Sequence, residues 1–324
     1  MRSRLLQGLF LLFALAALSS CGGAEPDSTA RGSESSPEPP RDAPADAPVL
    51  VADGWVTGDG GERTIRDAYG QTYRPLPDAR VVSVVPSVTE TLFALGVGAS
   101  VVGVTSNCDY PPEAASVEKV GDLNLNYEKI VSLAPTVVIG SRGFTDAARD
   151  VLAGAGIEYF SVSHASFQEI VESMHALGAL LGASAAADAI VAEFNAAIAR
   201  AEARRSGQDR ARVFWVQWNE PLSTVGPGNF HHDLIGFAGG QNVASDLGAP
   251  YGQFSEEAFA ARDADVVLTV GTDTVPWVEA RFPTLKATLA HRVYAFSSDE
   301  SARPGPRLVT ALDELSRLLY PDAR

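Results

Sequence analysis

Short apolar runs alternate with helical segments along most of this chain, and this alternation constrains the fold more than any other feature. Apolar runs of strand length occur at residues 81–85 and 101–104, and a second series begins at residues 212–216. Parallel strands that helices cover on both faces have this continuous apolar character. The sequence therefore predicts an α/β protein with parallel sheets. The other expected strands are residues 136–139, 159–162, 266–270 and 293–296, and the expected helices are residues 126–132, 146–155, 167–181 and 306–320, with others starting at Asp233 and Ser255.

The segment of residues 184–205 separates the two series and contains neither glycine nor proline. Its composition favours a helix, and about 22 residues at 1.5 Å each give a rod of roughly 33 Å. One more packed helix is the alternative. A connector is favoured because a new strand–helix series begins directly afterwards. We expect two Rossmann-like lobes, residues 51–183 and 207–324, joined by a single long α-helix at residues 184–206.

Local signals mark the start of the first lobe. Residues 55–73 predict short strands with turns at their glycines. Ser87 and Glu90 have the spacing of a capping box, which predicts that their side chains cap the helix after the first strand. Gly96 can close that helix.

The N-terminus carries an export signal. Arg2 and Arg4 precede the apolar stretch 5–18, which is too short to span a membrane comfortably. Residues 18–22, Leu-Ser-Ser-Cys-Gly, resemble a bacterial lipobox, in which the cysteine is lipidated after cleavage. We therefore expect a signal peptide at residues 1–20 and a lipid anchor on Cys21, facing the periplasm or cell exterior from the cell membrane or outer membrane. An ordinary secretory signal and a short anchor helix are the alternatives.

Residues 21–50 predict a disordered tether, because they are rich in serine, proline, alanine and acidic residues and cannot bury a core. The chain of 324 residues has a formal charge of −15 and no basic cluster in its body, which argues against nucleic acid as a partner. Once Cys21 is lipidated, Cys108 is the other cysteine, so the sequence supports no intrachain disulfide and no cysteine-rich metal site.

Two glutamates occupy matching places in a weak internal repeat. Asn126 and Ser255 are good N-cap residues, and Glu128 and Glu257 follow them by two positions. Each glutamate precedes a Val-Val pair by nine residues. Complementarity to the helix dipole is the common explanation for such residues. A matched pair of acidic docking groups, one per lobe, is the functional alternative.

Several motifs in order resemble the cobalamin/siderophore-type periplasmic binding proteins. The resemblance covers nearly everything from Asp53 to Tyr320, and its strength lies in the succession of motifs. The motifs are RVVSVVPSVTETL at 80–92, NCDYPP at 107–112, NYEKI at 126–130, LAPTVVI at 133–139, GGQN at 239–242, SEE at 255–257 and RPGPR at 303–307.

This resemblance implies a substrate-binding lipoprotein that captures a metal chelate between two lobes and delivers it to an ABC importer. It also implies that Glu128 and Glu257 contact arginines on the importer's membrane subunits, which favours the docking interpretation. An enzyme is not expected, nor is a bound cofactor or a metal held by the protein alone. The rivals are an exported lipoprotein hydrolase, for which no G-x-S-x-G, H-E-x-x-H or P-loop motif is found, and an adhesive or structural lipoprotein.

The resemblance also points to ligand contacts, although it does not identify the chelate as a corrinoid, a siderophore or heme. Tyr251, Asp299 and Arg303 match contact positions of cobalamin-binding members. The pocket is not a copy of theirs, because aromatic positions of those members are replaced. The replacing residues are Asn107, Leu123 and Glu300.

Other candidates for the site follow strands of the second lobe. Trp215 and Trp218 could stack on a flat macrocycle, although a half-buried core tryptophan is more common. His231 and His232 are expected in a loop before a helix. Either histidine could ligate a metal, but such a pair is more often a solvated loop feature or a hydrogen-bonding group at a helix start.

Overall fold

The computed structural model describes residues 49–52, 54–58 and 62–321. These belong to one compact unit, Val49–Arg324. The predicted signal peptide, the lipidation site at Cys21 and nearly all of the tether lie outside the described residues. Among the residues that are described, no helix has the length and apolarity needed to cross a membrane.

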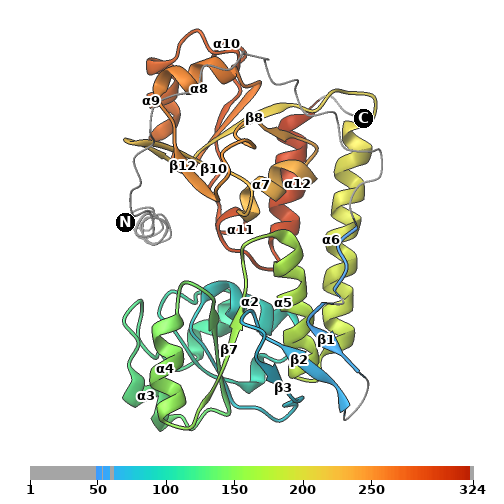
Figure 1. Cartoon of the computed structure of the whole chain (residues 1–324), viewed down its shortest axis with the longest axis vertical. Helices are drawn as coiled ribbons and strands as arrows, with labels where there is room; N and C mark the ends of the chain where they lie inside the picture. The colour runs from blue at the N-terminus through green and yellow to red at the C-terminus, as the bar shows by residue number, and fades with distance from the viewer. Residues whose placement is uncertain (1–48, 53, 59–61, 322–324) are drawn as a thin grey trace, which may run out of the picture. The chain divides into compact units, whose positions relative to one another are not determined.

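The first parallel sheet has its strands in the order β5-β4-β6-β7, and Figure 1 labels its edge strand β7. Val81 pairs with Val101 on one side and with Val137 on the other. Every residue of the two central strands is buried, as expected for strands covered on both faces. The strands are β4 (Val81–Ser83), β5 (Val101–Val104), β6 (Val137–Ser141) and β7 (Glu158–Val162).

Helices and a small antiparallel sheet complete this part of the molecule, which we call the first lobe. Asn126 caps the second of its α-helices by accepting a hydrogen bond from the amide of Lys129 at 2.9 Å, as predicted. The antiparallel sheet contains β1 (Val56–Thr57), β2 (Thr64–Arg66) and β3 (Thr72–Tyr73), and the helices are α2 (Pro86–Ala94), η2 (Gly98–Ser100), η3 (Pro112–Ser116), α3 (Tyr127–Ser132), α4 (Asp146–Gly154) and α5 (Phe167–Leu180).

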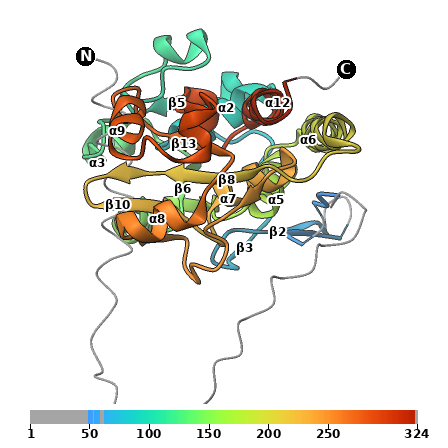
Figure 2. The same ribbon diagram turned by 90° about the horizontal axis from the view of Figure 1, so that it is seen from above.

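The second lobe repeats the plan with a parallel sheet in the order β11-β8-β13-β14. Figure 2 shows helices on both sides of its strands. The strands are β8 (Arg212–Val216), β11 (Gln241–Asn242), β13 (Val266–Thr269) and β14 (Val293–Ala295), and the helices are α7 (Phe230–Phe237), α8 (Glu256–Arg262), α9 (Thr274–Arg281), α10 (Lys286–Leu289), α11 (Asp299–Ala302) and α12 (Leu308–Leu319).

An antiparallel sheet that the sequence analysis did not predict lies beside the second parallel sheet. It has the order β12-β10-β9, with β9 (Trp218–Asn219), β10 (Leu222–Val225) and β12 (Tyr251–Gln253). Its strands are two to four residues long and lack a continuous apolar run, so periodicity gives little signal for them.

Helix α6 (Ser184–Arg205) starts at the predicted residue, ends one residue before the predicted end at 206, and contacts both lobes. It packs against α5 of the first lobe and α12 of the second (Figure 1). The contact with α5 is close, because a Cβ at Gly178 would lie 2.5 Å from the Cβ of Ala187. The connecting helix is therefore also a packed helix, and the two interpretations of its sequence are compatible.

The lobes meet directly beside α6 as well. Phe167, at the start of α5, packs against Phe194 of α6 and Phe237 of α7. The backbone amide of Phe167 donates to Asp233 Oδ2 at 2.9 Å. Apolar packing thus joins the lobes on this side.

Two local expectations are wrong. Helix α2 has Val85 as its N-cap residue with no side-chain hydrogen bond, so Ser87 and Glu90 form no capping box. The reason is that Pro86 starts the helix and Ser87 already lies within it. Helix α7 begins at Phe230, capped by Asn229, so the two adjacent histidines lie in its first turn and not in a preceding loop.

Candidate functional site

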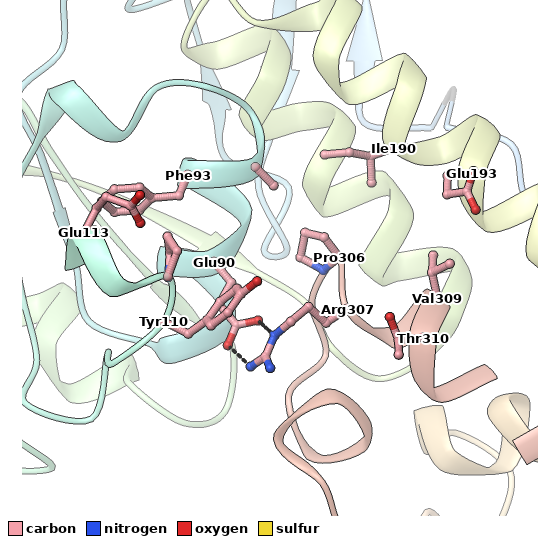
Figure 3. A pocket seen from close by; sticks show the side chains of 12 residues that line it. Glu90, Phe93, Tyr110, Glu113, Ile190, Glu193, Pro306, Arg307, Val309 and Thr310 are labelled. Atoms are coloured by element: carbon pink, nitrogen blue, oxygen red, sulfur yellow. Dashed lines mark hydrogen bonds and ion pairs between the residues drawn. The ribbon is translucent and has the colours of Figure 1, made fainter. Parts of the chain in front are cut away.

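A cavity of about 570 Å³ lies between the two lobes beside α6. Its walls come from α2 and the η3 region of the first lobe, from α6, and from the segment that begins α12 (Figure 3). Apolar and charged side chains share the lining, which includes Glu90, Phe93, Tyr110, Ile190, Pro306 and Arg307.

Glu90 is the most buried charge at this cavity, with 2% of its side chain exposed. Helix α2 directs its carboxylate across the gap, where Arg307 binds both oxygens (Figure 3). The distances are 2.9 Å from Nε to Oε2 and 2.7 Å from Nη2 to Oε1. Arg303 Nη1 lies 3.0 Å from Oε1 as well. A buried carboxylate requires such paired partners, and bidentate geometry fixes their orientation.

Four more contacts extend this pairing. Arg303 also contacts Asp109 at 2.8 Å and Asp299 at 3.6 Å. Arg307 contacts Glu300 at 2.7 Å, and its guanidinium lies 4.0 Å from the ring centroid of Tyr110. We call the six charged residues the interlobe ion network. Its members are Glu90 and Asp109 of the first lobe, and Asp299, Glu300, Arg303 and Arg307 of the second.

Two members of the network, Arg307 and Glu300, are held in their charged forms. Burial acts against ionisation of Arg307, but its hydrogen bonds to Glu90 and the nearby carboxylates raise its pKa far above the ordinary value. Burial likewise disfavours the charged form of Glu300, yet hydrogen bonds from its own backbone amide and Ser298, with the charge of Arg307, lower its pKa. Both groups therefore remain ionised.

The structure brings together Asp299 and Arg303 of the predicted ligand contacts, and both belong to the network. Tyr251 lies elsewhere, at the start of β12, where it pairs with Val225 and is half-buried. Burial raises the pKa of its hydroxyl, against a hydrogen bond with Asn229 that lowers it. Trp218 begins β9 of the same antiparallel sheet and is 38% exposed. Neither Tyr251 nor Trp218 lines the cavity described above. Asp299 and Arg303 are not lining residues either, but Arg303 is connected to the lining through its contact with Glu90.

Trp215 lies in the interior of the second lobe, with 1% of its surface exposed. Its indole Nε1 donates to Gln217 Oε1 at 2.9 Å, and its ring lies 4.3 Å from that of His231. In this structure the side chain therefore packs within the lobe, as tryptophan commonly does.

The paired histidines form hydrogen bonds at the start of α7. His231 is buried, with Nδ1 3.1 Å from Asn229 Oδ1 and Nε2 3.1 Å from the carbonyl of Ser301. Burial lowers its pKa to about 3, so the ring is neutral and can donate to only one of these oxygens at a time. His232 Nδ1 lies 3.1 Å from Asn242 Nδ2. The part of the chain that the structure describes contains no group of three histidine, cysteine or acidic residues placed to hold a metal.

Another histidine, His164, sits at the carboxyl end of the first parallel sheet. Its Nε2 lies 3.3 Å from Ser87 Oγ, and its Nδ1 lies 3.1 Å from Ser141 Oγ. Burial lowers its pKa to about 4. The sequence analysis assigned no chemistry to this residue.

Sequence reasoning did not assign Glu90, Asp109, Tyr110 or Arg307 to the site. Arg303 and Arg307 stand four residues apart on either side of a Pro-Gly-Pro segment. This spacing was an available signal for a paired cationic site. The signal for Glu90 was an acidic residue on an otherwise buried helix face.

Glu128 and Glu257 occupy equivalent local positions. Each is exposed and is the second residue of its helix, after the cap residues Asn126 and Ser255. Hydrogen bonds from its own backbone amide and from Ser255 lower the pKa of Glu257. Both helices therefore present a carboxylate at a capped first turn.

Two α/β lobes, a connecting helix and a cavity lined from both lobes define a two-lobed ligand-binding protein. The chain belongs to the periplasmic binding protein family, whose model matches residues 81–295. It is 33% identical over 271 residues to the ABC transporter substrate-binding lipoprotein YvrC of Bacillus subtilis (strain 168), which covers 80% of this chain and 86% of that relative.

Two further similarities concern proteins of stated ligand. A vitamin B12-binding protein of Salmonella typhimurium is 32% identical over 248 residues, which cover 74% of this chain and 90% of the relative. The structure of the periplasmic heme-binding protein RhuT from Roseiflexus sp. RS-1 matches with a TM-score of 0.64 at 28% identity, covering 76% of this chain and 99% of that one. The predicted α/β fold class and the predicted family are confirmed.

Proposed function

We propose that this protein captures a metal chelate, such as a corrinoid, siderophore or heme, between its two lobes and delivers it to an ABC importer. The observation that carries the proposal is the cavity lined from both lobes, with charged and aromatic side chains converging on it. Ligands of two-domain proteins commonly bind at such interfaces. The stated ligands of the vitamin B12-binding and heme-binding relatives support the chelate class.

Within this proposal, Arg303 and Asp299 contact the ligand from the second lobe, and Tyr251, Trp215 and Trp218 remain candidates on the same lobe. Arg303 has the best support, because it already reaches across the gap to Glu90 and Asp109. Trp215 has the least, because its ring is covered within the lobe. Glu128 and Glu257 dock to arginines of the importer.

The test is to purify the full-length protein in detergent, identify co-purified ligand by absorbance and mass spectrometry, and titrate it back by calorimetry. Arg303→Ala and Tyr251→Ala should each bind at least about tenfold more weakly, a loss of about 1.4 kcal/mol. Arg281→Ala is the matched control, since Arg281 pairs with Glu256 on the surface and takes no part in the interlobe ion network. Unchanged affinity in both cleft variants, with the fold intact, removes these residues from the site.

We also propose that Cys21 carries the lipid anchor. Cys21→Ser should move the protein from the membrane fraction to the soluble exported fraction, because serine lacks the thiol that receives the lipid. Fractionation with immunoblotting measures the change. A variant that stays in the membrane fraction shows that something other than Cys21 holds the protein there.

A further inference from the structure

The interlobe ion network contains more carboxylates than arginines. Glu90, Asp109, Asp299 and Glu300 face Arg303 and Arg307, so four formal negative charges meet two positive ones. Every one of these carboxylates lies within 4.0 Å of a guanidinium. The network therefore has a net formal charge of −2.

The arginines are neutralised from within their own lobe. Arg303 lies 3.6 Å from Asp299, and Arg307 lies 2.7 Å from Glu300, and all four residues belong to the second lobe. Separation of the lobes would therefore leave two compensated arginines on one side. The first lobe would present Glu90 and Asp109 on the other. In neither arrangement does the network offer an uncompensated cation to a ligand.

Further acidic residues stand at the same cavity. Glu113 from η3 and Glu193 from α6 belong to its lining. Of the described residues that line the cavity, Arg307 is the only basic one. Lys119 of the first lobe does not offset this charge within the network. Its ammonium donates to the carbonyl oxygens of Ala114 and Cys108, at 2.9 and 3.4 Å. The excess of negative charge thus extends beyond the six residues of the network.

We infer that this cleft selects metal chelates whose periphery is uncharged or cationic, such as an amide-fringed corrinoid, over chelates that carry carboxylates, such as heme. A ligand carboxylate would have to displace Glu90 or Asp109 from the arginines while facing the remaining acids. A ligand amide can accept from a guanidinium and donate to a carboxylate, so it fits the network without displacing a charge. The inference rests on the proposed function and narrows its substrate class.

The experiment compares ligands that differ in charge but not in macrocycle. Cyanocobalamin is compared with its side-chain carboxylic acid derivatives, and hemin diamide, with both propionates amidated, is compared with hemin. Affinities for the full-length protein in detergent are measured by calorimetry or absorbance titration. For a macrocycle that binds, the amide form should bind at least tenfold more tightly than the carboxylate form.

Variants locate the preference in the network. Glu90→Gln should narrow the amide-to-carboxylate affinity ratio at least fivefold, because it removes one negative charge and leaves two guanidinium groups with fewer partners. Asp109→Asn should narrow it in the same direction. Its side chain is 66% exposed, so this variant provides the test if Glu90→Gln unfolds. Glu202→Gln is the matched control, since Glu202 pairs with Arg205 on α6 outside the cavity lining. Its amide-to-carboxylate affinity ratio should equal that of the wild type.

Each outcome decides the question. Equal or tighter binding of the carboxylate forms by the wild type overturns the inference and leaves the proposed function standing. An unchanged ratio in both folded network variants also overturns it. If neither macrocycle binds in either form, the proposed function itself fails for these chelates and the inference fails with it.

Discussion

Single residues of this protein show how burial controls charge. His164 keeps its ring against Ser87 and Ser141 at the carboxyl end of the first sheet, and burial lowers its pKa to about 4 from 6.5. The network residues behave differently because each buried charge there has an opposite charge in contact. Burial alone neutralises a group, whereas burial with a partner preserves its charge.

The lowered pKa of His164 predicts a loss of stability in acid. The unfolded chain takes up a proton as the pH falls below 6.5, while the folded protein does not until about pH 4. Stability from this group is therefore complete above pH 6.5 and is lost as the pH falls toward 4. One pKa unit corresponds to about 1.4 kcal/mol. Since the residue as a whole is only half-buried, we expect the wild type to lose about 2 kcal/mol relative to His164→Gln.

Chemical denaturation at pH 7.5, 6.0 and 4.5 measures this difference. His291→Asn is the control, because His291 is exposed and its φ of 52° is a conformation that asparagine tolerates. Wild type and control should show the same pH slope. If the free energy of unfolding of His164→Gln depends on pH as steeply as that of the wild type, His164 does not titrate as described.

At the scale of elements, helices α3 and α8 give the lobes matching acidic first turns. A binding protein with two similar lobes can meet a transporter built from two copies of one subunit only if both lobes carry equivalent groups. Carboxylate–arginine pairs set orientation and register more than they add affinity. This is the physical basis of the docking proposal for Glu128 and Glu257.

The docking proposal predicts a separation of binding from transport. Glu128→Ala combined with Glu257→Ala should leave ligand affinity within about twofold and abolish uptake, because both exposed carboxylates lie outside the cavity lining. The single variants should be partly impaired. Calorimetry on the purified protein and uptake in cells carrying the importer measure the two effects.

Glu158→Ala combined with Glu314→Ala is the control, with one exposed glutamate changed in each lobe. Its uptake should match the wild type. Normal uptake by the docking variant, or a loss of ligand affinity in it, would show that Glu128 and Glu257 do not dock.

Elements were predictable where one sequence signal dominated. The bounds of α6 follow from a long stretch without glycine or proline, and β8 follows from a buried apolar run. Helix α7 was predicted too short, because its first turn contains histidines and a phenylalanine in place of a strong helix pattern. The interlobe ion network could not be predicted from local patterns, since Glu90 and Arg307 are 217 residues apart in sequence.

At the scale of the whole molecule, α6 and the contact of α5 with α7 join the lobes on one side, and the ion network joins them at the cavity. The first junction is apolar, through Phe167, Phe194 and Phe237. The second junction consists of charged groups, and water or a ligand can take the place of their ion-pair partners. We therefore expect the lobes to part more easily at the network than at the helix, in line with the modest closure expected of a single helical connector.

This division of the contacts has a thermal consequence. The heat capacity of a protein rises when apolar surface enters water and falls slightly when polar surface does. Parting the lobes at the ion network hydrates mainly Glu90, Arg303 and Arg307, while Phe167 stays covered at the other junction. Opening should then change the heat capacity very little, so the free-energy difference between the open and closed forms should vary almost linearly with temperature.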